Sequence, residues 1–324
     1  MPRDRPVLLA GATGAVGRAL VPVLQASGWR VRGASRDPER ARAGATALDW
    51  VRLDVDIPAT MAPALDGCGA AFFLVHGMSD GPGFVERERA AAEAFAAAAA
   101  DAGLARIVYL GGMVPEGVPS DHLRSRLETG RILREGAVPC VELRAGMVVG
   151  PGSVSWQIVR DIAVRLPVQI LPAWLESRSQ PVALADVCQV LVTALGLPLE
   201  GDAVALDVPG PETLRAGEIL QRVGDVLGRR PVQLRVPLMS PGLSAHWLRL
   251  VTRADPRVSA ALVHGLAHDL VAADDGIWSL LPGHRRTAFD DAVRDALEAE
   301  ERTVSARARR MERLIHRAAK LAGR

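Results

Sequence analysis

The sequence has few cysteines and no long apolar run. Its three cysteines, Cys68, Cys140 and Cys188, are far apart and lack any Cys-x-x-Cys spacing, which predicts reduced, mostly buried thiols in a cytoplasmic protein. The longest stretch of low charge, residues 90–100, is dominated by alanine and interrupted by Glu93, so it is too weakly apolar to span a bilayer. Because an apolar strand pattern already starts at Val7, we also expect no signal peptide.

The excess of positive over negative charge is small, and aromatic residues are scarce. A formal net charge of +2 on 324 residues gives no electrostatic reason to expect nucleic acid as the main partner. Aromatic residues make up 4% of the chain, and the single tyrosine, Tyr109, lies inside an apolar strand pattern. Apolar residues make up 49%, which is typical of a folded globular protein with one large or two modest domains.

A glycine-rich turn follows the first apolar run. The segment 7–18 reads VLLAGATGAVGR, with glycines at 11, 14 and 17 between a strand pattern and a helix pattern. Such glycines allow a sharp turn, let a pyrophosphate approach the backbone, and allow close packing of helix on strand. The helix N-terminus then presents free N–H groups to the phosphates. The expected dinucleotide-binding residues of this turn are Gly11, Thr13, Gly14, Ala15, Val16 and Gly17.

Strand-like and helix-like patterns alternate from residue 7 to about 150, which predicts βαβ units on a parallel sheet. The expected strands cover 7–10, 30–34, 50–53, 70–75, 107–110, 140–144 and 203–208. Helices are expected over 84–101, 121–135, 182–195 and 213–227, among others. The fold class is therefore α/β, a Rossmann-type doubly wound parallel sheet of about seven strands with a small, mostly helical C-terminal domain.

The predicted domains are a dinucleotide-binding domain over 1–210, a small substrate or lid domain over 211–285, and a charged C-terminal helix or helices over 286–324. The C-terminal segment is acidic first and basic later, which suits a helix dipole. Beneath the charges runs an apolar stripe of Val304, Ala308, Met311, Ile315, Ala318 and Leu321. We favour docking of this segment on the protein body; a second subunit and an anionic membrane surface are the alternatives.

The tip of the second strand selects between the two nicotinamide cofactors. Ser35 and Arg36 stand there, and they can hydrogen-bond and pair with a 2′-phosphate, whereas Asp37 before Pro38 is better placed to cap the next helix. NADP(H) is therefore favoured, with NAD(H) as the alternative. Later strand ends add further expected cofactor contacts, namely Asp54, Val55, Val75, His76 and Gly77.

These features resemble the atypical and extended short-chain dehydrogenase/reductases, in particular NmrA-like NAD(P)-binding proteins. The resemblance covers roughly residues 6–240 and is carried by GATGAVG, SRDPER, LDV, IVYLGG, HLRSRLETGRILREGAVPCVELRAGMVVGPGS and QPVALADV. It implies a seven-stranded parallel sheet and a small C-terminal domain that closes over the substrate. It also implies that Ser153, Ser155 and Trp156 lie near the nicotinamide end, where they shape a substrate pocket or cap a helix.

Active members of this superfamily use a Ser or Thr after the fifth strand and a Tyr-x-x-x-Lys on the next helix. The matching positions here hold Gly111–Gly112, His122 and Arg126. His122 could act as acid or base, although the Arg126 charge would lower its pKa and keep it neutral. Alternatively, hydride transfer to an electron-poor acceptor such as a quinone needs only a proton from water. A third reading is that the chain binds NADP(H) without turnover.

We expect an oxidoreductase that acts on a small apolar or quinone-like acceptor; the rival is a non-catalytic NADP(H)-binding sensor, regulator or assembly factor. Apolar segments that would form a lid, over 158–174 and 237–251, favour the enzyme, and the missing Ser, Tyr and Lys favour the rival. No metal site is expected: His264 and His268 are four residues apart, but no acidic partner completes a ligand set. The expected partner is a small-molecule substrate or effector, and homo-oligomerisation stays open.

Overall fold

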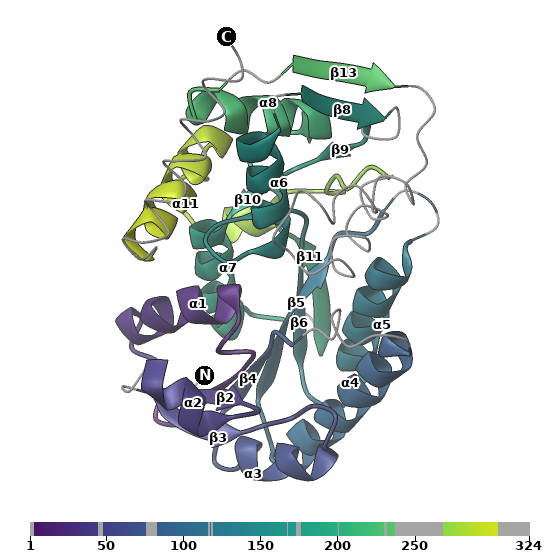
Figure 1. Cartoon of the computed structure of the whole chain (residues 1–324). Coiled ribbons are helices and arrows are strands. Elements are labelled where there is room, and N and C mark those ends of the chain that lie inside the picture. Colours follow the sequence, from purple (N-terminus) through teal and green to yellow (C-terminus); the bar gives the residue numbers. More distant parts are fainter. Residues whose placement is uncertain are drawn as a thin grey trace.

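The computed structural model has a parallel central sheet with helices on both faces (Figure 1). It describes residues 3–44, 48–75, 83–115, 117, 119–166, 168–172, 176–199, 201–229, 232–236 and 268–303. Within these ranges the main sheet has seven strands in the order β11-β6-β5-β4-β1-β2-β3. Every neighbouring pair in it is parallel. The predicted doubly wound α/β fold is confirmed.

The strands lie close to their predicted positions. Their bounds are β1 (Val7–Ala10), β2 (Val31–Ser35), β3 (Asp49–Arg52), β4 (Ala70–Phe73), β5 (Arg106–Gly112), β6 (Cys140–Ala145) and β11 (Ala203–Asp207). The helices between them are α1 (Ala15–Ala26), α2 (Pro38–Gly44), α3 (Met61–Leu65), α4 (Phe84–Asp101), α5 (Asp121–Glu135) and α7 (Leu184–Gly196), with a short 3-10 turn η1 (Pro58–Thr60) before α3. The expected helix over 182–195 begins two residues late because Val182–Ala183 forms a short strand, β10.

Successive side chains of β1 point to opposite faces of the sheet and belong to two separate apolar clusters. Val7 and Leu9 face α1 and α7, whereas Leu8 and Ala10 face α3 and α4, and all four side chains are buried. A strand buried on both faces needs a continuous apolar run, and the sequence VLLA supplies it. The sheet therefore lies between two helical layers, and its carboxyl ends are left open for ligands.

A smaller lobe extends from the carboxyl side of the sheet (Figure 1). It contains α6 (Val154–Arg165), α8 (Ala216–Val226) and α11 (Phe289–Thr303), which share a third apolar cluster. Short strand pairs complete it: β7 (Val148–Val149) with β10, β9 (Arg178–Ser179) with β12 (Leu214–Arg215), and β8 (Val168–Pro172) with β13 (Val232–Val236). The turn η3 (Gly276–Leu280) lies beside β11. The lobe joins segments from both sides of residue 210, and the domain boundaries stay a prediction.

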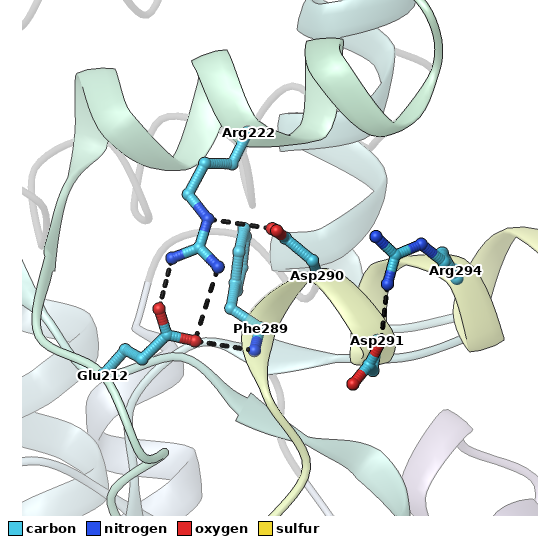
Figure 2. A network of polar contacts seen from close by, with 6 residues as sticks. All are labelled: Glu212, Arg222, Phe289, Asp290, Asp291 and Arg294. Carbon is cyan, nitrogen blue, oxygen red and sulfur yellow. Dashed lines mark hydrogen bonds and ion pairs between the residues drawn. The ribbon is translucent and has the colours of Figure 1, made fainter.

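The helix α11 docks on the protein body. Figure 2 shows Arg222 of α8 between Glu212 and Asp290, with its Nε 2.8 Å from Asp290 Oδ1. The guanidinium lies over the Phe289 ring, 5.2 Å from the centroid. At the other end of α11, Glu300 pairs with Arg160 and accepts a hydrogen bond from Trp156. The predicted apolar stripe from Val304 onward lies outside the described residues.

The cysteines, the helices and the possible metal ligands can be compared with the expectations from the sequence. All three cysteines are free and buried, and burial raises the pKa of Cys140 and Cys188 to about 12. None of the described helices has the length and apolarity that crossing a bilayer requires. Among the described residues, no group of three His, Cys, Asp or Glu side chains could hold a metal ion.

The Arg222 contacts predict that the C-terminal helix contributes to global stability. Replacing Arg222 by Ala should lower the free energy of unfolding by about 1–2 kcal/mol, because Glu212 and Asp290 lose a shared partner in a partly buried site. Urea denaturation measures this change. Arg294→Ala is the control, since Arg294 pairs with Asp291 on the exposed side of α11, and its change should stay within about 0.5 kcal/mol. Equal losses in the two variants would contradict the assignment.

Candidate cofactor-binding cleft

The glycine turn brings α1 unusually close to β1. Gly11 has φ +94°, and a Cβ there would lie 2.7 Å from the Leu74 carbonyl oxygen of the neighbouring chain segment. A Cβ on Gly17 would lie only 2.2 Å from the Gly11 oxygen. Neither position can accept a side chain without displacing backbone, so both glycines are required for the turn. Gly14 donates its N–H to the Gly11 oxygen at 2.9 Å and closes the turn.

The N-terminus of α1 is prepared for an anion. Gly14 is the N-cap residue, and no side chain caps the helix. No acidic residue lies in the first turn either. The amides of Ala15, Val16 and Gly17 precede the first full helical hydrogen bonds, so they are available to phosphate oxygens. The geometry thus fits a dinucleotide pyrophosphate, because no side chain caps the helix and the positive end of the helix dipole faces the phosphates.

A cleft of about 930 Å³ opens beside this turn along the carboxyl ends of β1 to β4. It runs from β3 across α4 to Thr129 of α5. Of the predicted cofactor residues, the following line it: Gly11, Thr13, Gly14, Ser35, Arg36, Asp54, Val55 and Val75. Ala15, Val16 and Gly17 lie in the first turn of α1, outside the lining. His76 and Gly77 fall outside the described residues.

The tip of β2 has the arrangement expected for a 2′-phosphate. The Asp37 carboxylate accepts the Arg40 backbone N–H at 3.0 Å, so it caps α2, as the sequence indicated. Ser35 Oγ donates to the Asp37 carbonyl at 3.1 Å. Arg36 and Arg40 are exposed in the cleft wall, and neither makes an ion pair within the described ranges. The sequence reading missed Arg40, although its place three residues after the cap would have put it beside Arg36.

The α5 helix carries His122 and Arg126 toward the end of β5. His122 is 5% exposed, and burial, with the nearby Arg126 charge, lowers its pKa to about 3. This confirms that Arg126 lowers the pKa of His122, with burial as the larger cause. Arg126 donates from Nη2 to the Leu110 carbonyl at 2.9 Å. Neither residue is in the cleft lining, and their catalytic roles stay predictions.

The Tyr109 side chain also lies beneath α5, where its hydroxyl binds main chain. Its hydroxyl donates to the Arg126 carbonyl at 3.0 Å, and complete burial raises its pKa. Next to it in the sheet, Glu142 of β6 is fully buried between Arg134, at 2.7 Å, and Arg144, at 3.0 Å. Its carboxylate occupies the space that a Cβ on Gly130 would need. The sequence sign of these two ion pairs was the single acidic residue, Glu142, in the strand sequence CVELRA.

The two serines and the tryptophan after β6 have mainly structural contacts. Ser153 Oγ donates to the Val148 carbonyl at 2.7 Å and lies 3.1 Å from Ser155 Oγ. Trp156 is fully buried against α11, and its indole N–H binds Glu300. His268 is described and His264 is not, so the structure does not test their pairing.

A glycine turn under an uncapped helix, a basic strand tip and a deep cleft at the sheet's carboxyl ends define a nicotinamide-dinucleotide-binding protein. In agreement, residues 11–165 match a protein family described as NAD(P)H-binding. The chain therefore contains an NAD(P)H-binding domain, as the sequence predicted. A search of curated protein sequences finds no match.

Several solved structures share the fold. The Citrobacter sp. triphenylmethane reductase complexed with NADP(H) is 16% identical, with a TM-score of 0.71, and the match covers 90% of this chain and 99% of that one. The NADPH-dependent quinone oxidoreductase of Escherichia coli complexed with NADPH is 18% identical, with a TM-score of 0.70 and coverage of 89% and 98%. MoeE5 in complex with UDP-glucose and NAD is 18% identical, with a TM-score of 0.69 and coverage of 93% and 100%.

The glycine turn generates a direct binding test. Gly14→Ala should keep the fold, because a Cβ there meets only the Gly11 oxygen at 3.2 Å, but it should weaken NADPH binding at least about tenfold by crowding the phosphates. Fluorescence titration with NADPH measures the Kd, and thermal unfolding verifies the fold. Gly196→Ala, at the end of α7 with nothing within 4 Å, should leave both unchanged. Unaltered binding in the Gly14 variant would remove the pyrophosphate from this turn.

Proposed function

We propose that the protein is an NADPH-dependent reductase of a small, apolar, electron-poor acceptor such as a quinone. The observation that carries this proposal is the makeup of the site between β5 and α5. Glycines occupy the position of the hydroxyl residue, and the pKa of His122 leaves it neutral near pH 7. A bound nicotinamide supplies a hydride, so the chain needs only to bind and orient the acceptor.

Acceptors differ in whether they need a proton from the protein. Reduction of a simple ketone to an alcohol benefits from a positioned acid, which contributes roughly 10²–10⁴-fold. A quinone or a similar conjugated acceptor has a stabilised anionic product, and water can protonate it. One protein of the same fold is named as an NADPH-dependent quinone oxidoreductase. That likeness supports the proposal without identifying the acceptor.

We assign the cofactor preference to the tip of β2. The side chains of Arg36 and Arg40 are exposed in the cleft wall, and Asp37 is engaged as a helix cap. Two guanidinium groups that make no ion pair among the described residues favour a 2′-phosphate, and the Asp37 carboxylate at this tip accepts a backbone N–H of α2. The proposed contacts to the remaining cofactor are those of the glycine turn, Asp54, Val55, Val75, His76 and Gly77.

The alternative function is an NADP(H)-binding sensor, regulator or assembly factor. The same observation that favours a hydride-only enzyme supports it, because the residues of the usual Ser, Tyr and Lys positions are all replaced. The sensor and the enzyme share the cofactor site and differ in turnover alone. The cofactor test and the turnover test are therefore separate.

The cofactor assignment predicts a specific loss. Arg36→Ala and Arg40→Ala should each raise the Kd for NADPH roughly 10–100-fold and leave the Kd for NADH unchanged, because only NADPH loses a charge-assisted contact. Isothermal titration calorimetry measures both constants. Arg42→Ala is the matched control on the same helix, since Arg42 pairs with the exposed Glu39. Equal affinity of the unaltered protein for NADH and NADPH would refute the preference.

The turnover assignment predicts a flat pH profile. NADPH oxidation with 1,4-naphthoquinone should depend little on pH between about 6 and 9, because the pKa of His122 lies near 3. His122→Ala should lower kcat less than about tenfold, less than the loss of a general acid costs. Absorbance at the NADPH band follows the rate against a protein-free blank. An acid limb that disappears in His122→Ala would restore His122 as the proton donor, and no turnover with a quinone panel would favour the sensor.

A further inference from the structure

We propose that Arg126 is the electrophilic group of the site: its guanidinium binds the acceptor oxygen and stabilises the negative charge that forms there. The site then takes neutral or anionic conjugated carbonyl compounds and disfavours cationic acceptors. This inference rests on the proposed reductase function and names its substrate class. The position, the neighbouring glycine, the unpaired atoms and the charge balance around Arg126 each support it.

The position of Arg126 is set by main chain on both sides. Its Nη2 donates to the Leu110 carbonyl at 2.9 Å, which places the guanidinium at the carboxyl end of β5. Its own carbonyl accepts the hydrogen bond of Tyr109 at 3.0 Å. Thr129, one turn further along α5, lines the cofactor cleft. In open parallel sheets, ligands bind outside the carboxyl ends of the strands, and Arg126 stands at such an end.

Gly112 lies directly beside this arginine. A Cβ on Gly112 would lie 3.4 Å from Arg126 Nε and 3.5 Å from its Cδ, which is ordinary van der Waals contact. It would also lie 3.2 Å from Leu123 Cδ2. The tight contact at this position is thus with Leu123, and the Arg126 side chain lies in ordinary contact distance of the strand end. At this end of β5 the chain offers a charged donor, Arg126, beside a glycine that has no hydroxyl.

Two polar atoms near this end of α5 have no hydrogen-bond partner among the described residues. Arg126 Nε and His122 Nδ1 are both buried without a hydrogen bond. His122 is 95% removed from solvent, and its side chain lies close enough to Arg126 for the charge to lower its pKa. Buried polar atoms without partners are costly and rare, and they cluster where a ligand or a water completes the site.

The positive charge of Arg126 is not cancelled nearby. It makes no ion pair with a residue in the described ranges, whereas Arg134 and Arg144 share the single carboxylate of Glu142. Glu88, an acid that lines the cleft near α5, accepts a hydrogen bond from the Ser125 hydroxyl. In a site of low dielectric, a fixed cation favours a reaction that creates an anion and disfavours binding of a second cation.

The reaction balances without a proton from the protein. A conjugated carbonyl acceptor gains a hydride, with two electrons, at an electron-poor carbon, and NADPH becomes NADP⁺. A new C–H bond forms, the C=C electron pair shifts, and the carbonyl oxygen becomes an oxyanion beside Arg126. Water then protonates the oxyanion and leaves hydroxide in solution. Neutral His122 donates or accepts a hydrogen bond there and transfers no proton.

The kinetic test compares Arg126→Gln, Arg126→Lys and Arg124→Gln. With 1,4-naphthoquinone, Arg126→Gln should lower kcat about 100-fold, and Arg126→Lys should recover at least a tenth of the activity because the charge is kept. Arg124→Gln removes an exposed charge of the same helix, paired with Asp121, and should behave as the unaltered protein. The Kd for NADPH should stay within about twofold in all three. Malachite green, a cationic acceptor, should be reduced poorly, and better by Arg126→Gln.

The second test reads charge stabilisation without turnover. 4-Nitrophenol absorbs near 400 nm only as the phenolate, so its titration in the presence of protein and NADP⁺ reports the ionisation state of the bound ligand. We expect it to bind as phenolate at a pH where the free compound is mostly neutral, and Arg126→Gln should abolish this effect.

The two tests separate the inference from the function on which it rests. Quinone turnover in Arg126→Gln equal to that of the unaltered protein, or 4-nitrophenol that stays neutral or unbound, would overturn the role of Arg126. Phenolate binding that depends on Arg126, in a protein that binds NADPH but reduces no acceptor, would support the anion site and overturn the reductase. Loss of NADPH binding in Arg126→Gln would also contradict the inference, because it would place Arg126 on the cofactor instead.

Discussion

The close approach of α1 to β1 is the contact on which the cofactor site depends. A Cβ on Gly17 would lie 2.2 Å from the Gly11 oxygen, so only glycine lets the helix begin directly above the strand end. That start points the uncapped amides of the first turn into the cleft and carries Arg18, whose guanidinium binds the Thr13 carbonyl, to the cleft wall. The parallel strands then add their carboxyl ends side by side, and each end contributes one part of the lining. The dinucleotide site thus follows from one steric constraint and the sheet order.

The two ends of the cleft are built by different rules. At β2 the chain keeps the usual chemistry, with a hydroxyl, a helix cap and two arginines around the place of a 2′-phosphate. At β5 it differs from the Ser, Tyr and Lys pattern of the enzymes that it resembles, since Gly112 lies beside Arg126, and burial together with the Arg126 charge lowers the pKa of His122. Among the described residues, this end of the sheet therefore presents a fixed charge on Arg126 and a His122 whose pKa is lowered to about 3. This contrast links an NAD(P)H-binding fold to the hydride-only chemistry proposed above.

Local patterns predicted the sheet well, because strands buried on both faces need apolar runs and the glycine turn has a steric cause. The turn, the strands, and the helices over 84–101 and 121–135 were all readable from spacing. Glu142 was not readable, because its partner Arg134 lies on a helix and the space for its carboxylate comes from Gly130. The ribbon of β8 with β13 and the Arg222 contacts to α11 join segments about 60 residues apart, for which no local signal exists. His122 was found by its position, but only burial reveals how far its pKa is lowered.

A crystal structure of the complex with NADPH tests the central claim most directly, because it locates every group that surrounds the nicotinamide. The account predicts a pyrophosphate on the amides that follow Gly14 and a 2′-phosphate between Arg36 and Arg40. It also predicts a nicotinamide ring that faces the β5 end of α5, with the Arg126 guanidinium as the nearest charged group and no side-chain hydroxyl or acid in position to donate a proton. A nicotinamide directed away from α5, or a protonated acid within hydrogen-bond distance of the acceptor site, would contradict it.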